Sequence, residues 1–338
     1  MGDALLEINH LHTHFKTDQE EVPAVNGIDL SLKEGEIVGI VGESGPGKSV
    51  TAMSIMQLIP SPPGKIVNGE IIFKGENLVN TSEKRMRHIR GNNISMIFQD
   101  PMTSLDPLFT IGNQLAEGIR LHKKMSKKEA YQQSVDLLKQ VGIPRADEIV
   151  HEYPHQLSGG MRQRVMIAMA MSCEPDLLIA DEPTTALDVT IQAQILDLML
   201  QLNQKQNTAI LLITHDLGVV AEVCDRVVVM YAGQLVENGT KREVLKDPKH
   251  PYSQGLIRSL PNIKEREQKL YSIPGTVKQP KIGEVGCPFA PRCEFAFDRC
   301  FKETPQLYTL QSPGRSSRCF LYDNKEGNVT RNVATFRS

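Results

Sequence analysis

The stretch GESGPGKSVT, Gly42 to Thr51, decides the fold of this 338-residue chain. It fits the spacing G-x-x-x-x-G-K-[ST], and it follows a short apolar run, EIVGIVG, and precedes a segment with helical periodicity, SVTAMSIMQLI. A strand, a glycine-rich turn and a helix in this order bind phosphate through backbone N–H groups and the positive end of the helix. The alternative is a flexible loop with an incidental Lys-Ser pair. The flanking strand and helix favour the phosphate-binding loop.

This loop predicts the roles of individual residues. Lys48 is expected to reach the β- and γ-phosphates, and the Ser49 hydroxyl to bind Mg²⁺. Pro46 cannot donate a hydrogen bond, so we expect one phosphate contact fewer and weaker nucleotide binding than in a Pro46→Ser variant. The residues expected to contact the nucleotide are Gly42, Glu43, Ser44, Gly45, Gly47, Lys48, Ser49 and Val50.

A pair of acids follows a second buried run, LLIADEP, where Asp181 ends the predicted strand and Glu182 comes next. An aspartate in this position holds Mg²⁺ in phosphoryl-transfer sites. Glu182, one residue further out, is placed to activate a water molecule as a general base. The alternative is that Asp181 only caps the following helix. A cap would require neither the second carboxylate nor the buried strand.

Two further segments carry polar residues at element ends. LSGGMRQR begins at Leu157 and opens a predicted helix with Ser158, Gly159 and Gly160, a pattern that binds anions or simply caps the helix. His215 ends the apolar run TAILLITHD. A histidine there is either a hydrogen-bonded surface residue or a group that reaches a bound phosphate. The preceding strand with its two acids favours the second interpretation.

Composition restricts the class of protein. Lys and Arg number 38 and Asp and Glu 40, for a net charge of −2, which gives no support to nucleic-acid binding. No apolar run approaches the length that crosses a bilayer. The N-terminus, MGDALLEINH, carries acids where a secretory signal has basic residues. We therefore expect a cytosolic protein with no nucleic-acid partner.

LSGGMRQR resembles the signature motif of ATP-binding-cassette (ABC) ATPases, and GESGPGKS and LLIADEP match two more diagnostic motifs of that family in the same order. The resemblance implies an α/β P-loop fold with a mixed core sheet, an antiparallel β subdomain and a helical subdomain around residues 100–165. It implies hydrolysis of ATP to ADP and phosphate. It also implies that Ser158, Gly159 and Gly160 close on ATP held by a second ATPase subunit.

Lesser motifs of the family match as well. Phe98-Gln99-Asp100 resembles the Q-loop, which implies that Gln99 binds Mg²⁺ with Ser49 and Asp181. Ala186-Leu187-Asp188 resembles the D-loop, and Thr214-His215-Asp216 the switch loop, in which His215 reaches the γ-phosphate. The family stacks adenine on an aromatic residue of the first strands, for which Phe15 is the candidate, although Phe15 could equally be a core residue.

Three stretches resemble the oligopeptide/dipeptide importer branch, which also contains nickel importers: MIFQDPMTSLDPLFTIGNQL (Met96–Leu115), ADEPTTALDVTIQAQIL (Ala180–Leu196) and KHPYSQGLIRSLP (Lys249–Pro261). This implies a peripheral subunit at the cytoplasmic face of the membrane. The implied partners are a second, different ATPase, two transmembrane permeases and an extracytoplasmic binding protein. The cargo stays open among peptides, nickel and other solutes. A non-transport cassette and an inactive interaction module are the less favoured alternatives.

The C-terminal part differs in composition, and we expect a nucleotide-binding domain over residues 1–255, a C-terminal domain over 256–325 and a disordered tail over 326–338. Cys287, Cys293, Cys300 and Cys319 follow the spacing C-x₅-C-x₆-C-x₁₈-C, unlike the C-x₂-C pairs of zinc ribbons. Four thiolates can hold a [4Fe–4S] cluster. The importer branch has a similar region associated with such a cluster. Zinc and four free buried thiols are the alternatives.

Overall fold

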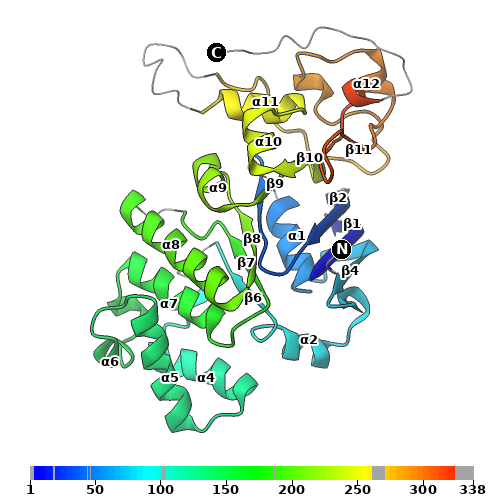
Figure 1. The fold of residues 1–338 in the computed structure, drawn as a ribbon. Helices are drawn as coiled ribbons and strands as arrows, with labels where there is room; N and C mark the ends of the chain where they lie inside the picture. The colour runs from blue at the N-terminus through cyan, green and yellow to red at the C-terminus, as the bar shows by residue number, and fades with distance from the viewer. Residues whose placement is uncertain are drawn as a thin grey trace.

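The computed structural model describes residues 4–17, 20–43, 45, 47–99, 104–185, 188–260 and 271–323 (Figure 1). These residues form an eight-stranded sheet in the order β11-β12-β10-β9-β3-β8-β7-β6 and a four-stranded sheet in the order β2-β1-β4-β5. β6, β7, β8, β3 and β9 run parallel, and β10, β12 and β11 continue the sheet antiparallel. The predicted mixed core sheet is therefore confirmed.

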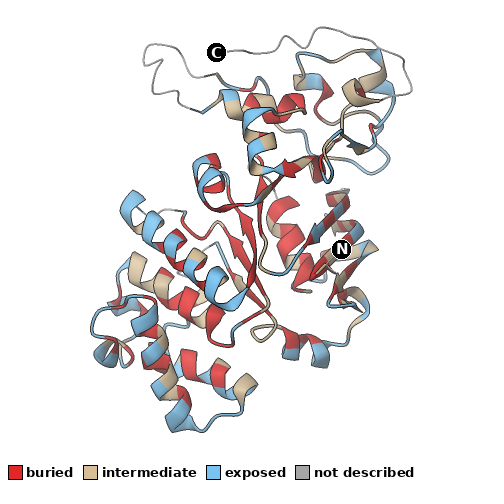
Figure 2. Ribbon diagram, in the orientation of Figure 1, coloured by how far each residue is buried: buried red, intermediate tan, exposed pale blue. Residues whose placement is uncertain are grey.

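The central strands of the eight-stranded sheet are short and almost entirely apolar. β3, β7 and β8 are buried at every position, as expected for parallel strands covered on both faces (Figure 2). The strands of this sheet are β3 (Ile37–Val41), β6 (Ile94–Ile97), β7 (Leu177–Asp181), β8 (Ala209–Ile213), β9 (Arg226–Tyr231), β10 (Gln234–Thr240), β11 (Tyr308–Thr309) and β12 (Ser316–Ser317).

The second sheet is antiparallel and comes from the N-terminal part of the chain, as the resemblance implied. Its strands are β1 (Leu6–Lys16), β2 (Glu21–Leu32), β4 (Gly64–Phe73) and β5 (Glu76–Asn77). It packs with α1 (Gly47–Ile55) on one face of the core sheet, where Val38 and Ile40 of β3 point. Ile37 and Val41, at alternate positions, face the other side and its helices.

The remaining helices cover that other face or lie at its edges (Figure 1). The predicted helical subdomain around 100–165 is present as α4, α5, α6 and the start of α7, and Ser126 and Glu129 form a capping box at the start of α5. The helices are α2 (Glu83–Ile89), α4 (Ile111–Lys123), α5 (Lys127–Gln140), α6 (Ala146–Ile149), α7 (Gly159–Met171), α8 (Val189–Gln206), α9 (Leu217–Val223), α10 (Lys241–Lys246), α11 (Pro251–Arg258) and α12 (Asp298–Lys302). None in the described part of the chain is long and apolar enough to span a membrane.

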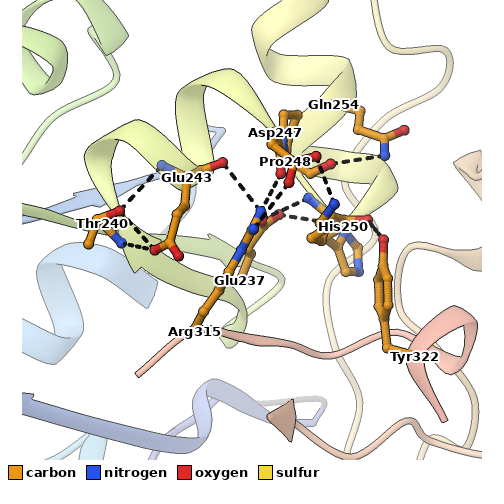
Figure 3. Close-up of polar contacts among 10 residues, drawn as sticks. Glu237, Thr240, Glu243, Asp247, Pro248, His250, Gln254, Arg315 and Tyr322 are labelled. Carbon is orange, nitrogen blue, oxygen red and sulfur yellow. Dashed lines mark hydrogen bonds and ion pairs between the residues drawn. The ribbon is translucent and has the colours of Figure 1, made fainter. Parts of the chain in front are cut away.

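A buried carboxylate ties the C-terminal residues to the core sheet (Figure 3). Glu237 of β10 is fully buried and accepts hydrogen bonds from the backbone N–H groups of Lys249 and His250, both at 2.8 Å. Arg315, which lies 4.0 Å from Glu237, also pairs with Asp247 at 3.1 Å. Because β12 pairs with β10, the eight-stranded sheet itself includes residues beyond 255. The division after residue 255 stays a prediction, and the tail 326–338 lies outside the described residues.

Candidate functional site

The predicted phosphate loop joins the end of β3 to the start of α1. Lys48 lies in the first turn of α1, is 6% exposed, and donates from Nζ to the carbonyl oxygens of Gly42 (3.0 Å) and Glu43 (2.8 Å). A side chain at Gly42 would place its Cβ 2.2 Å from the carbonyl oxygen of Met230, so only glycine fits there. Burial lowers the pKa of Lys48, although three nearby carboxylates oppose this shift. The two carbonyl oxygens therefore hold the ammonium next to the loop.

The other loop residues lie as follows. Gly45 and Gly47 border a cavity of about 230 Å³ beside the loop, and Val50 is buried in α1. Ser44 and Pro46 lie outside the described residues, as do Asp100 of the Q-loop and Ala186 and Leu187 of the D-loop.

Asp181 ends β7 beside this loop. It is 4% exposed, and its Oδ1 has no hydrogen-bond partner among the residues that the structure describes. Burial raises the pKa of Asp181, and the Ser49 hydroxyl and the Lys48 ammonium act against that shift. A buried carboxylate oxygen without a partner, next to a serine hydroxyl, fits a hard cation that takes oxygen ligands, such as Mg²⁺.

Glu182 holds a backbone conformation that non-glycine residues rarely adopt, with a φ of +48°. Its Oε2 accepts from Gln99 Nε2 at 3.1 Å and from Thr185 Oγ1 at 3.0 Å, and its Oε1 lies 3.4 Å from His215 Nδ1. Strain of this kind persists where the surroundings over-determine it, and it is concentrated at functional sites. Its own turn and two distant segments thus hold one carboxylate near the phosphate loop.

Thr185 was not among the residues that the sequence pointed to. The only signal was its place three residues after Glu182, which lets its hydroxyl reach back to the carboxylate. The sequence could have suggested Thr185 as a hydrogen-bond partner of Glu182, because Ser and Thr hydroxyls often bond to nearby groups in turns.

The serine–glycine turn lies elsewhere in the chain. Ser158 caps α7, its Oγ accepting from the N–H of Met161 at 3.3 Å, and a Cβ on Gly159 would meet nothing within 4 Å. α7 packs on the face of the core sheet opposite to α1 (Figure 1). A Cβ on Gly160 would lie 3.3 Å from Ile191 of α8. The helix that begins at this turn therefore lies across the core sheet from the helix to which Lys48 belongs.

Phe15, the candidate for contact with adenine, is partly buried in β1. It lies opposite Val22 of β2 and Gly64 of β4 and packs against the core beneath the antiparallel sheet. Val22 also lines the cavity beside the phosphate loop. The ring is close to that cavity in the sheet but is not among its lining residues, and its role stays a prediction.

The four C-terminal cysteines line one cavity of about 20 Å³, together with four phenylalanines and five other residues, including the buried His250. Burial raises the pKa of Cys293 to about 11 and that of Cys319 to about 12. In the described residues no group of three or more His, Cys, Asp or Glu side chains is arranged to hold a single metal ion. The cysteines are Cys287, Cys293, Cys300 and Cys319.

Comparison with known families agrees with these features. Residues 25–185 match the model of the ABC transporter family, and residues 236–300 match the C-terminal region of oligopeptide/dipeptide transporters. The oligopeptide transport ATP-binding protein AppD of Bacillus subtilis is 56% identical over 95% of this chain and 98% of its own. The dipeptide transport ATP-binding protein DppD of Escherichia coli is 51% identical over 94% and 96%.

Solved structures resemble the cassette part. The ATP-binding cassette MJ0796, a dimer bound to ADP and phosphate, matches with a TM-score of 0.64 and 28% identity over 70% of this chain and 99% of its own. The ABC transporter subunit cbiO1 of Clostridium perfringens matches with a TM-score of 0.61 and 28% identity over 72% and 92%. The phosphate loop, the two acids and these relationships together lead to one conclusion: the chain belongs to the ATP-binding proteins of the oligopeptide/dipeptide branch of the ABC transporter family.

Proposed function

We propose that this chain is the ATP-hydrolysing subunit of a peptide importer. The observation that carries the proposal is the convergence of Lys48, Asp181 and Glu182 at one edge of the core sheet, with an unpaired Asp181 oxygen and a strained, multiply held Glu182. The names of both relatives refer to transport of peptides, which favours peptides over nickel as the cargo.

The chemistry follows from the positions of these side chains. Lys48 and the loop amides bind the phosphates and offset their charge. Glu182, oriented by Gln99 and Thr185, accepts a proton from the water that attacks the γ-phosphate. His215, beside Glu182, contacts the γ-phosphate. When bound by Ser49, Gln99 and Asp181, Mg²⁺ supplies positive charge against the phosphate oxygens.

A second molecule completes the site in this proposal. Ser158, Gly159 and Gly160 open at the N-terminus of α7, where backbone N–H groups can meet phosphate from another subunit. A dimer of a related cassette, MJ0796, exists in a state with ADP and phosphate. We propose a heterodimer with a different ATPase, at the cytoplasmic face of the membrane, under two permeases supplied by an extracytoplasmic binding protein.

Uptake of labelled di- and oligopeptides by cells that lack this chain tests the function. We expect peptide uptake to be lost and to return with the wild-type gene but not with Glu182→Gln. Nickel uptake should be unchanged. Loss of nickel uptake with normal peptide uptake would instead identify a nickel importer.

We also propose that the C-terminal residues 256–325 form a domain around a [4Fe–4S] cluster held by Cys287, Cys293, Cys300 and Cys319. The support is that all four thiols line one cavity. Zinc needs four ligands within bonding distance of one atom, whereas a cluster spreads its thiolates over four irons. The phenylalanines around the cavity would shield the cluster from water.

Purification without oxygen tests the cluster. We expect about four irons and four sulfides per chain and a broad absorption near the violet–blue edge, because Cys₄ sites of this kind hold [4Fe–4S]. Cys293→Ser should remove most of the iron, whereas Cys173→Ser, a substitution of a buried cysteine elsewhere, should retain it. Stoichiometric zinc without iron, or a metal-free protein, would contradict the proposal.

A further inference from the structure

We propose that Arg292, in the C-terminal segment, is a positioning residue for the phosphate loop, and that it strengthens ATP binding through Glu43. This inference rests on the proposed function, since it assumes that the loop binds ATP. It adds a residue that neither the loop motif nor the signature motif contains, 249 positions away from its partner in the chain.

Arg292 and Glu43 form a two-pronged ion pair. Nη1 of Arg292 lies 2.6 Å from Oε2 of Glu43, and Nη2 lies 2.9 Å from Oε1. The Arg292 side chain is 6% exposed and that of Glu43 29% exposed, so the pair is largely shielded from solvent. A buried, bidentate arginine–carboxylate pair has a fixed geometry and is stronger than a surface pair.

All three polar groups of Glu43 are engaged. Its carboxylate pairs with Arg292, its carbonyl oxygen accepts from Lys48, and its N–H donates to the Tyr252 hydroxyl at 2.6 Å. Tyr252 belongs to α11 and is fully buried. Glu43 therefore connects the catalytic lysine on one side with two C-terminal residues on the other.

Arg292 is itself rigidly placed. It donates from Nε to the carbonyl oxygen of Pro274 at 2.7 Å and from Nη1 to the Tyr231 hydroxyl at 3.3 Å. Its guanidinium lies 5.9 Å from the ring centre of Phe289, a residue of the cysteine cavity. Arg292 thus links the C-terminal segment to the phosphate loop through fixed hydrogen bonds.

Two physical effects make the Arg292–Glu43 ion pair favourable for ATP binding. A loop held in one conformation loses less entropy when it binds the triphosphate. Arg292 also neutralises a carboxylate that would otherwise repel the negative phosphates. Removing Arg292 alone frees the loop and also leaves the Glu43 carboxylate unpaired near the phosphates. Removing both charges frees the loop but leaves no unpaired carboxylate.

The test is the dissociation constant of Mg-ATP for the full-length chain, measured with a fluorescent ATP analogue before appreciable hydrolysis. We expect Arg292→Ala to raise the constant by about tenfold, as for loss of hydrogen bonds to a charged group. Adding Glu43→Gln to that variant should bring the constant back to within roughly threefold of wild type, since the unpaired charge is gone. A residue needed only for folding would show no such recovery.

Arg299→Ala is the matched control, because Arg299 also precedes a cysteine of the cavity but pairs with Glu303 at 2.9 Å and with Asp323 at 3.0 Å. Its ATP affinity should equal that of wild type.

If Arg292→Ala does not fold, Arg292→Gln replaces it, with an expected rise of roughly fivefold in the dissociation constant of Mg-ATP. A folded Arg292 variant with wild-type affinity, or a double variant no better than Arg292→Ala, would overturn the proposal. Wild-type protein that binds no ATP would refute the proposed function instead.

Discussion

The Glu182→Gln variant is expected to bind ATP as wild type does and to hydrolyse it about 10²- to 10⁴-fold more slowly, the range that general-base catalysis supplies. Glutamine keeps the size of the side chain and can still accept hydrogen bonds from Gln99 and Thr185. It cannot take a proton from water. The loss should therefore appear in kcat and leave the dissociation constant for ATP nearly unchanged. Steady-state phosphate release and equilibrium ATP binding measure the two quantities.

Glu174→Gln is the matched control for this variant. Glu174 also holds a positive φ, +55°, and also carries an ion pair, to Lys123 at 2.8 Å, but its side chain is 61% exposed. We expect normal hydrolysis in that variant. Hydrolysis by Glu182→Gln at the wild-type rate would show that another group activates the water.

Lys48→Ala should reduce ATP affinity by about 10²- to 10⁴-fold, because the variant loses hydrogen bonds from an ammonium to two phosphates, each contributing about 1.5–3 kcal/mol. The same ammonium acts against the rise in the pKa of Asp181 that burial causes. Without it, Asp181 and Glu182 would face the triphosphate with less positive charge beside them. Equilibrium binding of a fluorescent ATP analogue gives the affinity, and the melting temperature reports whether the variant is folded.

Lys74→Ala provides the comparison for this loss. Lys74 pairs with Asp176 at 2.6 Å and is 45% exposed, so its removal should change ATP affinity little. Equal affinity of the Lys48→Ala and Lys74→Ala variants would place the triphosphate away from the predicted loop.

Features encoded over a few neighbouring residues were predictable. The hairpin turn at Ala232–Gly233 is present between β9 and β10, with φ values of +46° and +76°, as a two-residue turn between antiparallel strands requires. Glycine adopts this conformation freely, whereas Ala232 adopts it under strain. The helix over TIQAQILDLMLQLNQKQ is present as α8, which follows from its apolar periodicity. In the site, the positions of Asp181, Glu182 and His215 at strand ends were predictable from apolar runs of recognisable length, and that of Lys48 from the glycine-rich turn. Their roles stay predictions.

Contacts between distant segments were not predictable in the same way. The spacing of the four cysteines does not reveal that they line one cavity with phenylalanines. The addition of β12 to the edge of the core sheet at β10 depends on a pairing of Glu237 with Ser317, which no local pattern indicates.

The sequence by itself determined the phosphate loop, its two acids, the ABC family and most helices and strands, because turn chemistry and apolar periodicity act over a few residues. Only the tertiary structure decided which residues support the loop from outside. Arg292 and Tyr252 reach Glu43 across 249 and 209 positions of chain. Such contacts depend on how the C-terminal segment packs on the core, since charge and hydrogen-bonding capacity alone fit many partners.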